Sequence, residues 1–112
     1  MTELRGYQKA IAEATGVTDP AIIEQIETHM REDVFHSTLD WQSKAQFNKG
    51  AREAFKLWCA FHPEATDAQI INAHFITKAD RHWIRTRSVE VIAEAVSNIR
   101  IAYAKMREEV AA

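Results

Sequence analysis

Residues 88–110 read SVEVIAEAVSNIRIAYAKMREEV and contain the strongest pattern in the chain. Apolar side chains alternate three and four residues apart over three heptads, at Val89, Ile92, Val96, Ile99, Tyr103, Met106 and Val110. This spacing predicts one long amphipathic helix, because it places all seven side chains on a single face. At 1.5 Å per residue the helix would be ~35 Å long. We expect its apolar seam to pack against the other helices of a bundle.

Apolar residues elsewhere also recur at helical rather than alternating spacing, and only three glycines and two prolines interrupt them. We therefore predict an all-α fold, a single compact bundle of about five helices. Gly16 is the expected end of the first helix, and Asp19 with Pro20 is the expected start of the second. Short polar side chains predict a turn at 36–42, and Pro63 ends the third helix.

The fourth helix has a clear start and an open end. Thr66 and Gln69 have the spacing of a capping box and mark the start. The helix then either stops near Lys78 or runs on through Trp83, and we place the boundary with the last helix loosely near Thr86. Its expected inner face consists of Ile71, Phe75 and Ala79.

Length and composition predict one domain over residues 1–112. The chain has 112 residues, 46% hydrophobic and 27% charged, which is typical of a globular protein. No apolar run approaches the ~20 residues of a membrane span, and the N-terminus lacks the pattern of a signal peptide. Cys59 is the only cysteine, which rules out an intrachain disulfide. These observations predict a cytoplasmic protein without membrane contact.

No motif of catalysis or metal binding is present. The sequence has no glycine-rich phosphate loop, no nucleophile elbow and no paired-histidine motif of metalloproteases. Cys59 and His62 supply half a zinc site at most, and a buried thiol is the favoured interpretation. We therefore expect no enzyme, no catalytic residue, no metal and no cofactor.

A dense basic segment with an interleaved aromatic residue is the first candidate binding surface. Its members are Lys78, Arg81, His82, Trp83, Arg85 and Arg87. Such a cluster attracts phosphate, an exposed Trp83 would stack on a base or fill a partner's pocket, and the surrounding pattern resembles a helix-turn-helix. Against nucleic acid, the isoelectric point is about 6.2 and the turn lacks glycine. Alternatively, the segment pairs with the first 35 residues, which carry seven acids and three bases.

Two further surfaces are candidates for protein contacts. Aromatic residues crowd the stretch 35–61, and the third helix cannot turn all of them inward, so Phe35, Trp41 and Phe55 are candidate interface residues. A helix buried on two sides explains these aromatics equally well. The C-terminal helix is expected to pack inside the bundle, but it is long enough to extend into a homodimer as well.

The stretch from Met30 to Phe55 reads MREDVFHSTLDWQSKAQFNKGAREAF and resembles segments of small uncharacterised proteins encoded by phages and other mobile elements of proteobacteria. It covers about a quarter of the chain and carries no functional residue over. The resemblance implies that the chain binds a host macromolecule, as repressors, antitoxins and anti-defence inhibitors do.

The leading hypothesis is therefore a non-enzymatic protein-binding module, such as an inhibitor of a host macromolecule, that presents a rigid helical surface to another protein. The alternative is a small DNA- or RNA-binding regulator that uses residues 78–87.

Overall fold

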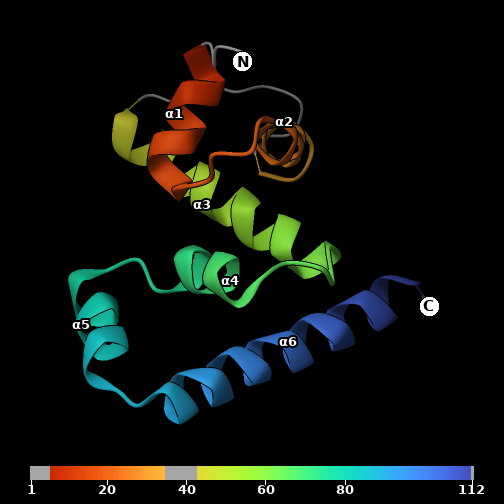
Figure 1. Ribbon diagram of the computed structural model, residues 1–112. Helices are drawn as coiled ribbons and strands as arrows, with labels where there is room; N and C mark the ends of the chain where they lie inside the picture. The colour runs from red at the N-terminus through yellow and green to blue at the C-terminus, as the bar shows by residue number, and fades with distance from the viewer. Residues whose placement is uncertain (1–5, 35–42, 112) are drawn as a thin grey trace. The chain divides into compact units, whose positions relative to one another are not determined.

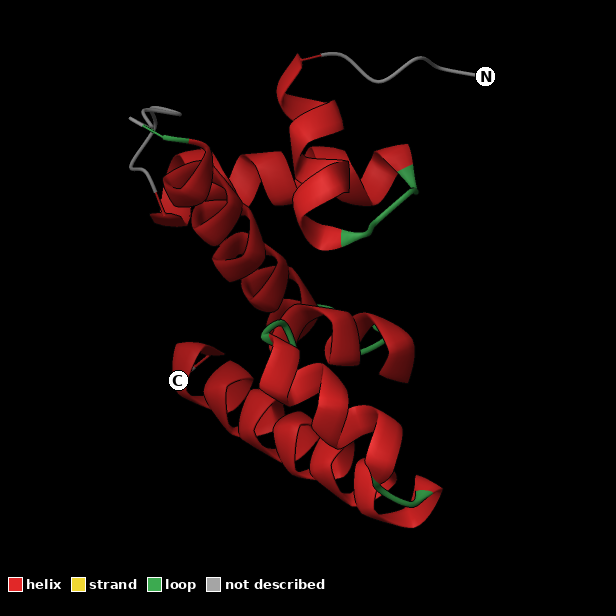
Figure 2. Cartoon of the chain, turned by 90° about the vertical axis from the view of Figure 1, so that its left-hand side faces the viewer, coloured by secondary structure: helices red, strands yellow, loops and turns green. Residues whose placement is uncertain are grey.

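The computed structural model describes residues 6–34 and 43–111, and Figure 1 shows their elements in chain order. These are α1 (Gly6–Thr15), α2 (Pro20–His29), the π-helix η1 (Met30–Val34), α3 (Lys44–Phe61), α4 (Asp67–His74), α5 (Lys78–Thr86) and α6 (Val89–Ala111). Figure 2 shows helices and loops and no strand in these two ranges. The predicted all-α class is thereby confirmed for the described residues.

The chain divides into two compact units, Met1–Trp58 and Cys59–Ala112. The division falls within α3, so that the last residues of this helix belong to the second unit. A single domain over residues 1–112 stays a prediction.

In the first unit, local signals set the boundary between α1 and α2. Gly16 follows α1 with a φ of 77°, in the left-handed region that favours glycine, and its N–H donates to the carbonyl of Ala12 at 2.8 Å. The carboxylate of Asp19 accepts a hydrogen bond from the N–H of Ala21 at 2.9 Å, and Pro20 occupies the first turn of α2. Both boundaries match the sequence prediction.

Apolar side chains of α1, α2 and α3, with one from the α1–α2 connection and one from η1, form the core of this unit. Two polar contacts tie α3 to the other helices. Trp58 Nε1 donates to Gln25 Oε1 on α2 at 2.5 Å, and Arg52 Nε donates to the carbonyl of Ala14 on α1 at 3.3 Å. The buried hydrophobic residues are Ile11, Val17, Ile23, Ile26, Met30, Phe47, Ala51, Ala54, Phe55 and Trp58.

In the second unit, α4 contacts the long helix α6. The C-terminal segment is one unbroken helix, as predicted. Its seam is buried only in the middle, at Val96 and Tyr103, whereas Val89 and Val110 near the ends are 79% and 66% exposed. The expectation that the whole seam packs inside the bundle is therefore wrong at both ends. The physical reason is length, because α6 has 23 residues and α4 has only eight.

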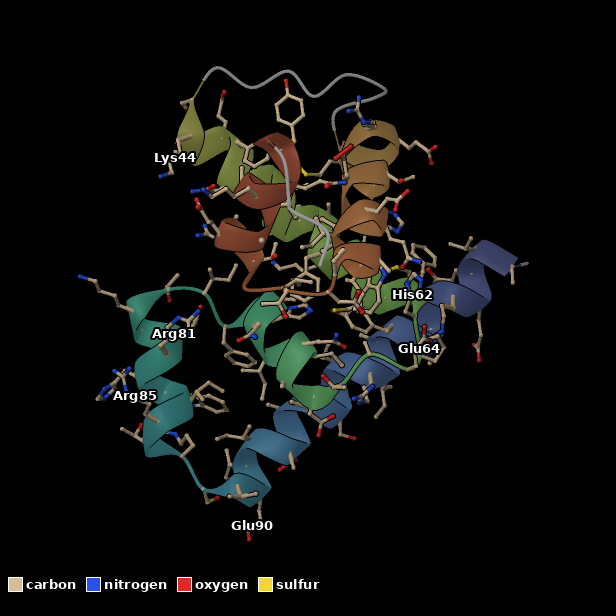
Figure 3. All side chains as sticks on the ribbon, turned by 45° about the horizontal axis from the view of Figure 1, so that its top comes forward. Lys44, His62, Glu64, Arg81, Arg85 and Glu90 are labelled. Carbon is tan, nitrogen blue, oxygen red and sulfur yellow. The ribbon has the colours of Figure 1, made fainter. Side chains whose placement is uncertain are left out.

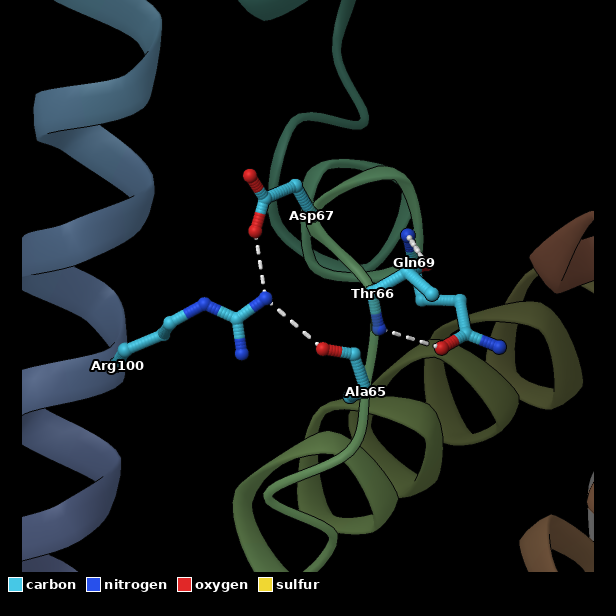
Figure 4. Close-up of polar contacts among 5 residues, drawn as sticks. All are labelled: Ala65, Thr66, Asp67, Gln69 and Arg100. Atoms are coloured by element: carbon cyan, nitrogen blue, oxygen red, sulfur yellow. Dashed lines mark hydrogen bonds and ion pairs between the residues drawn. The ribbon is translucent and has the colours of Figure 1, made fainter.

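Two arginines of α6 hold the connection between α3 and α4. Arg100 Nη2 donates to the carbonyl of Ala65 at 2.9 Å and to the carboxylate of Asp67 at 2.5 Å, as Figure 4 shows. Arg107 Nη1 donates to the carbonyl of Ala60 at 2.6 Å. Since carbonyls at a helix end and in a turn lack helical partners, these bonds satisfy groups that would otherwise need water.

Residues 66–86 form two helices, α4 and α5, so the described residues contain six α-helices where about five were expected. The start of α4 matches the prediction, because the capping box of Thr66 and Gln69 is complete. The helix breaks before Lys78, which was one of the two alternatives, and α5 starts at a second box, in which the Thr77 hydroxyl accepts from the Asp80 N–H at 3.0 Å. In return the Asp80 carboxylate accepts from the Thr77 N–H at 3.1 Å.

This break also changes the buried face of α4. Ile70 and Ala73 are buried, whereas Ile71 and Phe75 are half-buried and Ala79 is exposed. The predicted inner face of Ile71, Phe75 and Ala79 is therefore wrong. It assumed one continuous helix through Phe75, and the chain turns there instead.

Candidate functional site

The helix α5 carries most of the predicted basic segment and has no buried residue. Its start is fixed by the capping box of Thr77 and Asp80, and Asp80 Oδ2 also accepts from the N–H of Ile76 at 3.2 Å. Near its end the Thr86 hydroxyl donates to the carbonyl of His82 at 2.9 Å. Local hydrogen bonds rather than burial therefore define this helix.

The predicted basic residues all lie on the exposed surface of α5 or directly after it. We call this surface the α5 face, and it comprises Lys78, Arg81, His82, Arg85 and Arg87. Figure 3 shows Arg81 and Arg85 on successive turns of α5. Within residues 6–34 and 43–111, no carboxylate forms an ion pair with any lysine or arginine of the α5 face.

Trp83 differs from its neighbours because it is half-buried. Its ring stacks on Phe75, with the ring centroids 5.6 Å apart and the planes inclined by 4°. The guanidinium of Arg87 lies 5.8 Å from the centroid of the Trp83 ring, within the range of a cation–π contact. The expectation of an exposed Trp83 that stacks on a base is therefore wrong, because the indole is held in contacts within the second unit.

A pocket of about 200 Å³ lies between α4 and α5. Ile71 and Phe75 line it from the α4 side, and Arg81, Ile84 and Arg85 line it from α5. We call it the α4–α5 pocket. Sequence reasoning found its two arginines and missed its apolar residues. The spacing of Arg81, Ile84 and Arg85, three and four apart, was the available signal, because it places one apolar and two charged side chains on the same side of a helix.

The predicted aromatic interface is not part of this site. Phe55 is 1% exposed, so its assignment to an exposed interface is wrong. It is buried on α3 beside Trp58, which is on the same helix. The ring centroids of these two residues are 6.2 Å apart. The other two candidates, Phe35 and Trp41, lie outside the described residues.

Cys59 and Tyr103 are buried side chains of the second unit, and the thiol is not activated as a nucleophile. Burial raises the pKa of the Cys59 thiol to about 12, although the positive charge of Arg100 acts in the opposite direction. Burial, and next the charge of Cys59, likewise raise the pKa of Tyr103 above its usual range. The Tyr103 hydroxyl is in hydrogen-bond contact with Nε2 of His74. A thiol with such a pKa is neutral at pH 7 and therefore poorly reactive.

The described residues contain neither a cluster of metal-binding side chains nor a membrane-spanning helix. Residues 6–34 and 43–111 contain no group of three or more His, Cys, Asp or Glu side chains placed to hold a metal ion. In the same part of the chain, no helix combines the length and apolar character that crossing a membrane requires. The cytoplasmic location stays a prediction.

A comparison of the chain with protein-family models, with curated proteins and with solved structures finds no match. The α5 face and the α4–α5 pocket are therefore interpreted from their own chemistry.

Proposed function

We propose that this chain is a non-enzymatic protein-binding module and that the α5 face is its binding surface. The observation that carries the proposal is the combination found on α5: exposed cations without carboxylate partners beside a pocket with an apolar lining. Protein interfaces commonly combine an apolar centre, which supplies affinity, with charges that set orientation and association rate. Arginine is favoured in such interfaces because its planar guanidinium binds carboxylates through two parallel hydrogen bonds.

The resemblance of residues 30–55 to segments of phage and mobile-element proteins supports a host macromolecule as the partner, and an anti-defence inhibitor is one example. The resemblance lies outside α5, so the two lines of support are independent.

The proposal is tested by capturing partners from the native host with three tagged proteins. These are the wild type, the double variant R81E/R85E and the control K49E/K105E. Lys49 and Lys105 are exposed and lie on α3 and α6, so the control changes the net charge by the same amount. Proteins retained by the wild type and the control, but lost with R81E/R85E, are the expected result. Equal retention by all three proteins would contradict a binding role of the α5 face.

A DNA- or RNA-binding regulator is the second candidate, and one specific observation favours it. The helices α4 and α5 are joined by the three residues 75–77, and the second helix is exposed, as in a helix-turn-helix. Two observations favour a protein partner instead: Trp83 is stacked on Phe75, and apolar side chains line the α4–α5 pocket. Binding to phosphates should weaken by orders of magnitude between 50 and 200 mM salt, and a gel shift across that range tests for it.

We also propose a homodimer through the exposed ends of α6. Val89 and Val110 lie on the seam side of this helix, whereas Ile101 lies on the opposite side and is 64% exposed. If the ends of the seam pair between two copies, Val89→Glu and Val110→Glu should lower the sedimentation coefficient at high concentration. Ile101→Glu is the matched control and should leave the coefficient unchanged. An unchanged coefficient in all variants would remove the dimer proposal.

A further inference from the structure

We infer that the α4–α5 pocket takes one large apolar side chain from an acidic protein segment, whose carboxylates bind Arg81 and Arg85. The inference rests on the proposed function and specifies the chemistry of the partner. Its occupant is a protein segment of a different chain, in which an apolar residue stands beside two acidic residues.

The size and lining of the pocket determine the apolar part of this ligand. A dry cavity of about 150 Å³ accommodates benzene, so a pocket of about 200 Å³ has room for one aromatic or large aliphatic side chain. Ile71 and Phe75 on one side and Ile84 on the other offer it apolar contacts. Burial of such a side chain is a common source of binding energy at interface centres.

The two arginines determine the charged part of the ligand. Arg81 and Arg85 stand four residues apart on α5, so their side chains leave the helix on the same side about one turn apart. Both line the same pocket, and neither forms an ion pair with a carboxylate of the described residues. An acidic segment with two carboxylates one turn apart is complementary to this spacing.

Contacts within the second unit hold the pocket in shape before a ligand arrives. Phe75, which lines the pocket, is stacked on Trp83, and the guanidinium of Arg87 lies over the Trp83 ring. The start of α5 is fixed by the capping box of Thr77 and Asp80. A preformed site loses less conformational entropy on binding, which favours affinity for a short segment.

A carboxylate-bearing protein segment fits these observations better than a nucleic acid. Phosphate groups would satisfy Arg81 and Arg85 equally well. However, a phosphate backbone has no apolar group to contact Ile71, Phe75 and Ile84. A base would need a free aromatic face, and the ring of Trp83 is already stacked on Phe75.

Peptide titration tests the inference on the 112-residue chain labelled with ¹⁵N. The probe is a short helix-forming peptide with two Glu residues four apart and one Phe on the same face, added to about 1 mM. Two matched peptides replace both Glu with Gln, or Phe with Ser. We expect amide shifts at Ile71, Phe75 and 81–85, and binding at least ten-fold weaker for each matched peptide. Shifts elsewhere, or equal binding of the three peptides, would overturn the inference.

Protein variants identify the contacts of the probe. R81E/R85E should bind the acidic peptide at least ten-fold more weakly, and a peptide with Lys in place of both Glu should restore binding to this variant. K49E/K105E should bind the acidic peptide as the wild type does. Ile84→Ser should bind it more weakly, because an apolar contact in the pocket is lost. Far-UV circular dichroism checks that each variant keeps its helices. Undiminished binding of the acidic peptide by R81E/R85E would overturn the inference.

The outcomes also separate this inference from the proposed function. If the acidic peptide fails to bind while capture of a native partner still depends on Arg81 and Arg85, the inference is wrong and the proposed function stands. If a DNA duplex shifts the same amides and its binding weakens steeply with salt, a nucleic-acid partner replaces both.

Discussion

The guanidinium of Arg100 on α6 joins the carboxylate of Asp67 to the carbonyl of Ala65, and these two contacts differ in their surroundings. The side chain of Asp67 is 65% exposed, whereas Ala65 is buried. An exposed ion pair contributes little because water and salt screen it, but a buried carbonyl that loses its donor is costly. The hydrogen bond to Ala65 should therefore contribute more to the free energy of unfolding than the ion pair with Asp67 does.

We expect Arg100→Ala to lower the free energy of unfolding by about 1–3 kcal/mol. Asp67→Asn should lower it by at most about 1 kcal/mol, because it removes only the exposed ion pair. Urea denaturation followed by circular dichroism measures both. Equal losses in the two variants would assign the stabilisation to the ion pair instead.

The capping box at the start of α5 should control the local stability of that helix. Replacement of an N-cap threonine by alanine costs about 1 kcal/mol, so Thr77→Ala should accelerate hydrogen exchange of the α5 amides roughly five-fold. Thr66→Ala, the matched variant in the box of α4, should accelerate exchange in α4. If Thr77→Ala leaves exchange in α5 unchanged, the helix does not depend on its cap.

Phe55 should behave as a core residue. Phe55→Ala removes a side chain that is 1% exposed, so we expect a loss of about 3–5 kcal/mol in the free energy of unfolding. Phe61→Ala is the control on the same helix, and its 37% exposed side chain should cost less. Thermal unfolding of both variants measures the difference. A Phe55→Ala variant as stable as the wild type would contradict the burial of this residue.

The raised pKa of Cys59 predicts a loss of stability in alkaline solution. Burial raises the pKa of the thiol from its ordinary value of 9.0 to about 12, so above pH 9.0 the unfolded chain binds fewer protons than the folded chain. Stability from this group is complete below pH 9.0 and declines as pH rises, by at most about 1.4 kcal/mol per pH unit.

Urea denaturation of the wild type and Cys59→Ala at pH 7.5 and 9.5 measures this decline. Cys59→Ala lowers the free energy of unfolding at both pH values because it leaves a cavity. Its free energy of unfolding should, however, decline less than that of the wild type from pH 7.5 to pH 9.5. Parallel pH dependence in the two proteins would show that the thiol does not titrate as expected.

Boundaries with a strong local signal were predictable from sequence. Gly16 indicated the end of α1 and Asp19 the start of α2, because glycine and aspartate are favoured at these positions. The apolar spacing of residues 89–110 predicted α6. The box of Thr77 and Asp80 was present in the sequence as well, but no glycine or proline lies between Lys78 and Trp83, so an end near Lys78 and a continuation through Trp83 both stayed open. The number of helices was therefore underestimated.

Burial and pocket formation were less predictable, because they depend on residues distant in sequence. Whether Phe55 is inside depends on how many helices surround α3, which spacing along one helix does not reveal. The α4–α5 pocket joins Ile71 to Ile84 across a turn that the sequence offered only as one of two alternatives. The basic residues of α5 were identified because clustered charge is visible in the sequence alone.

A helix without a fully buried residue has a consequence for how this protein can evolve. No residue of α5 is buried, so most substitutions on it leave the packing of Ile70, Ala73 and Tyr103 intact. If the α5 face is the binding surface, as proposed, recognition and folding depend largely on different side chains. A few mutations in α5 would then change the binding target without compensating changes in the interior.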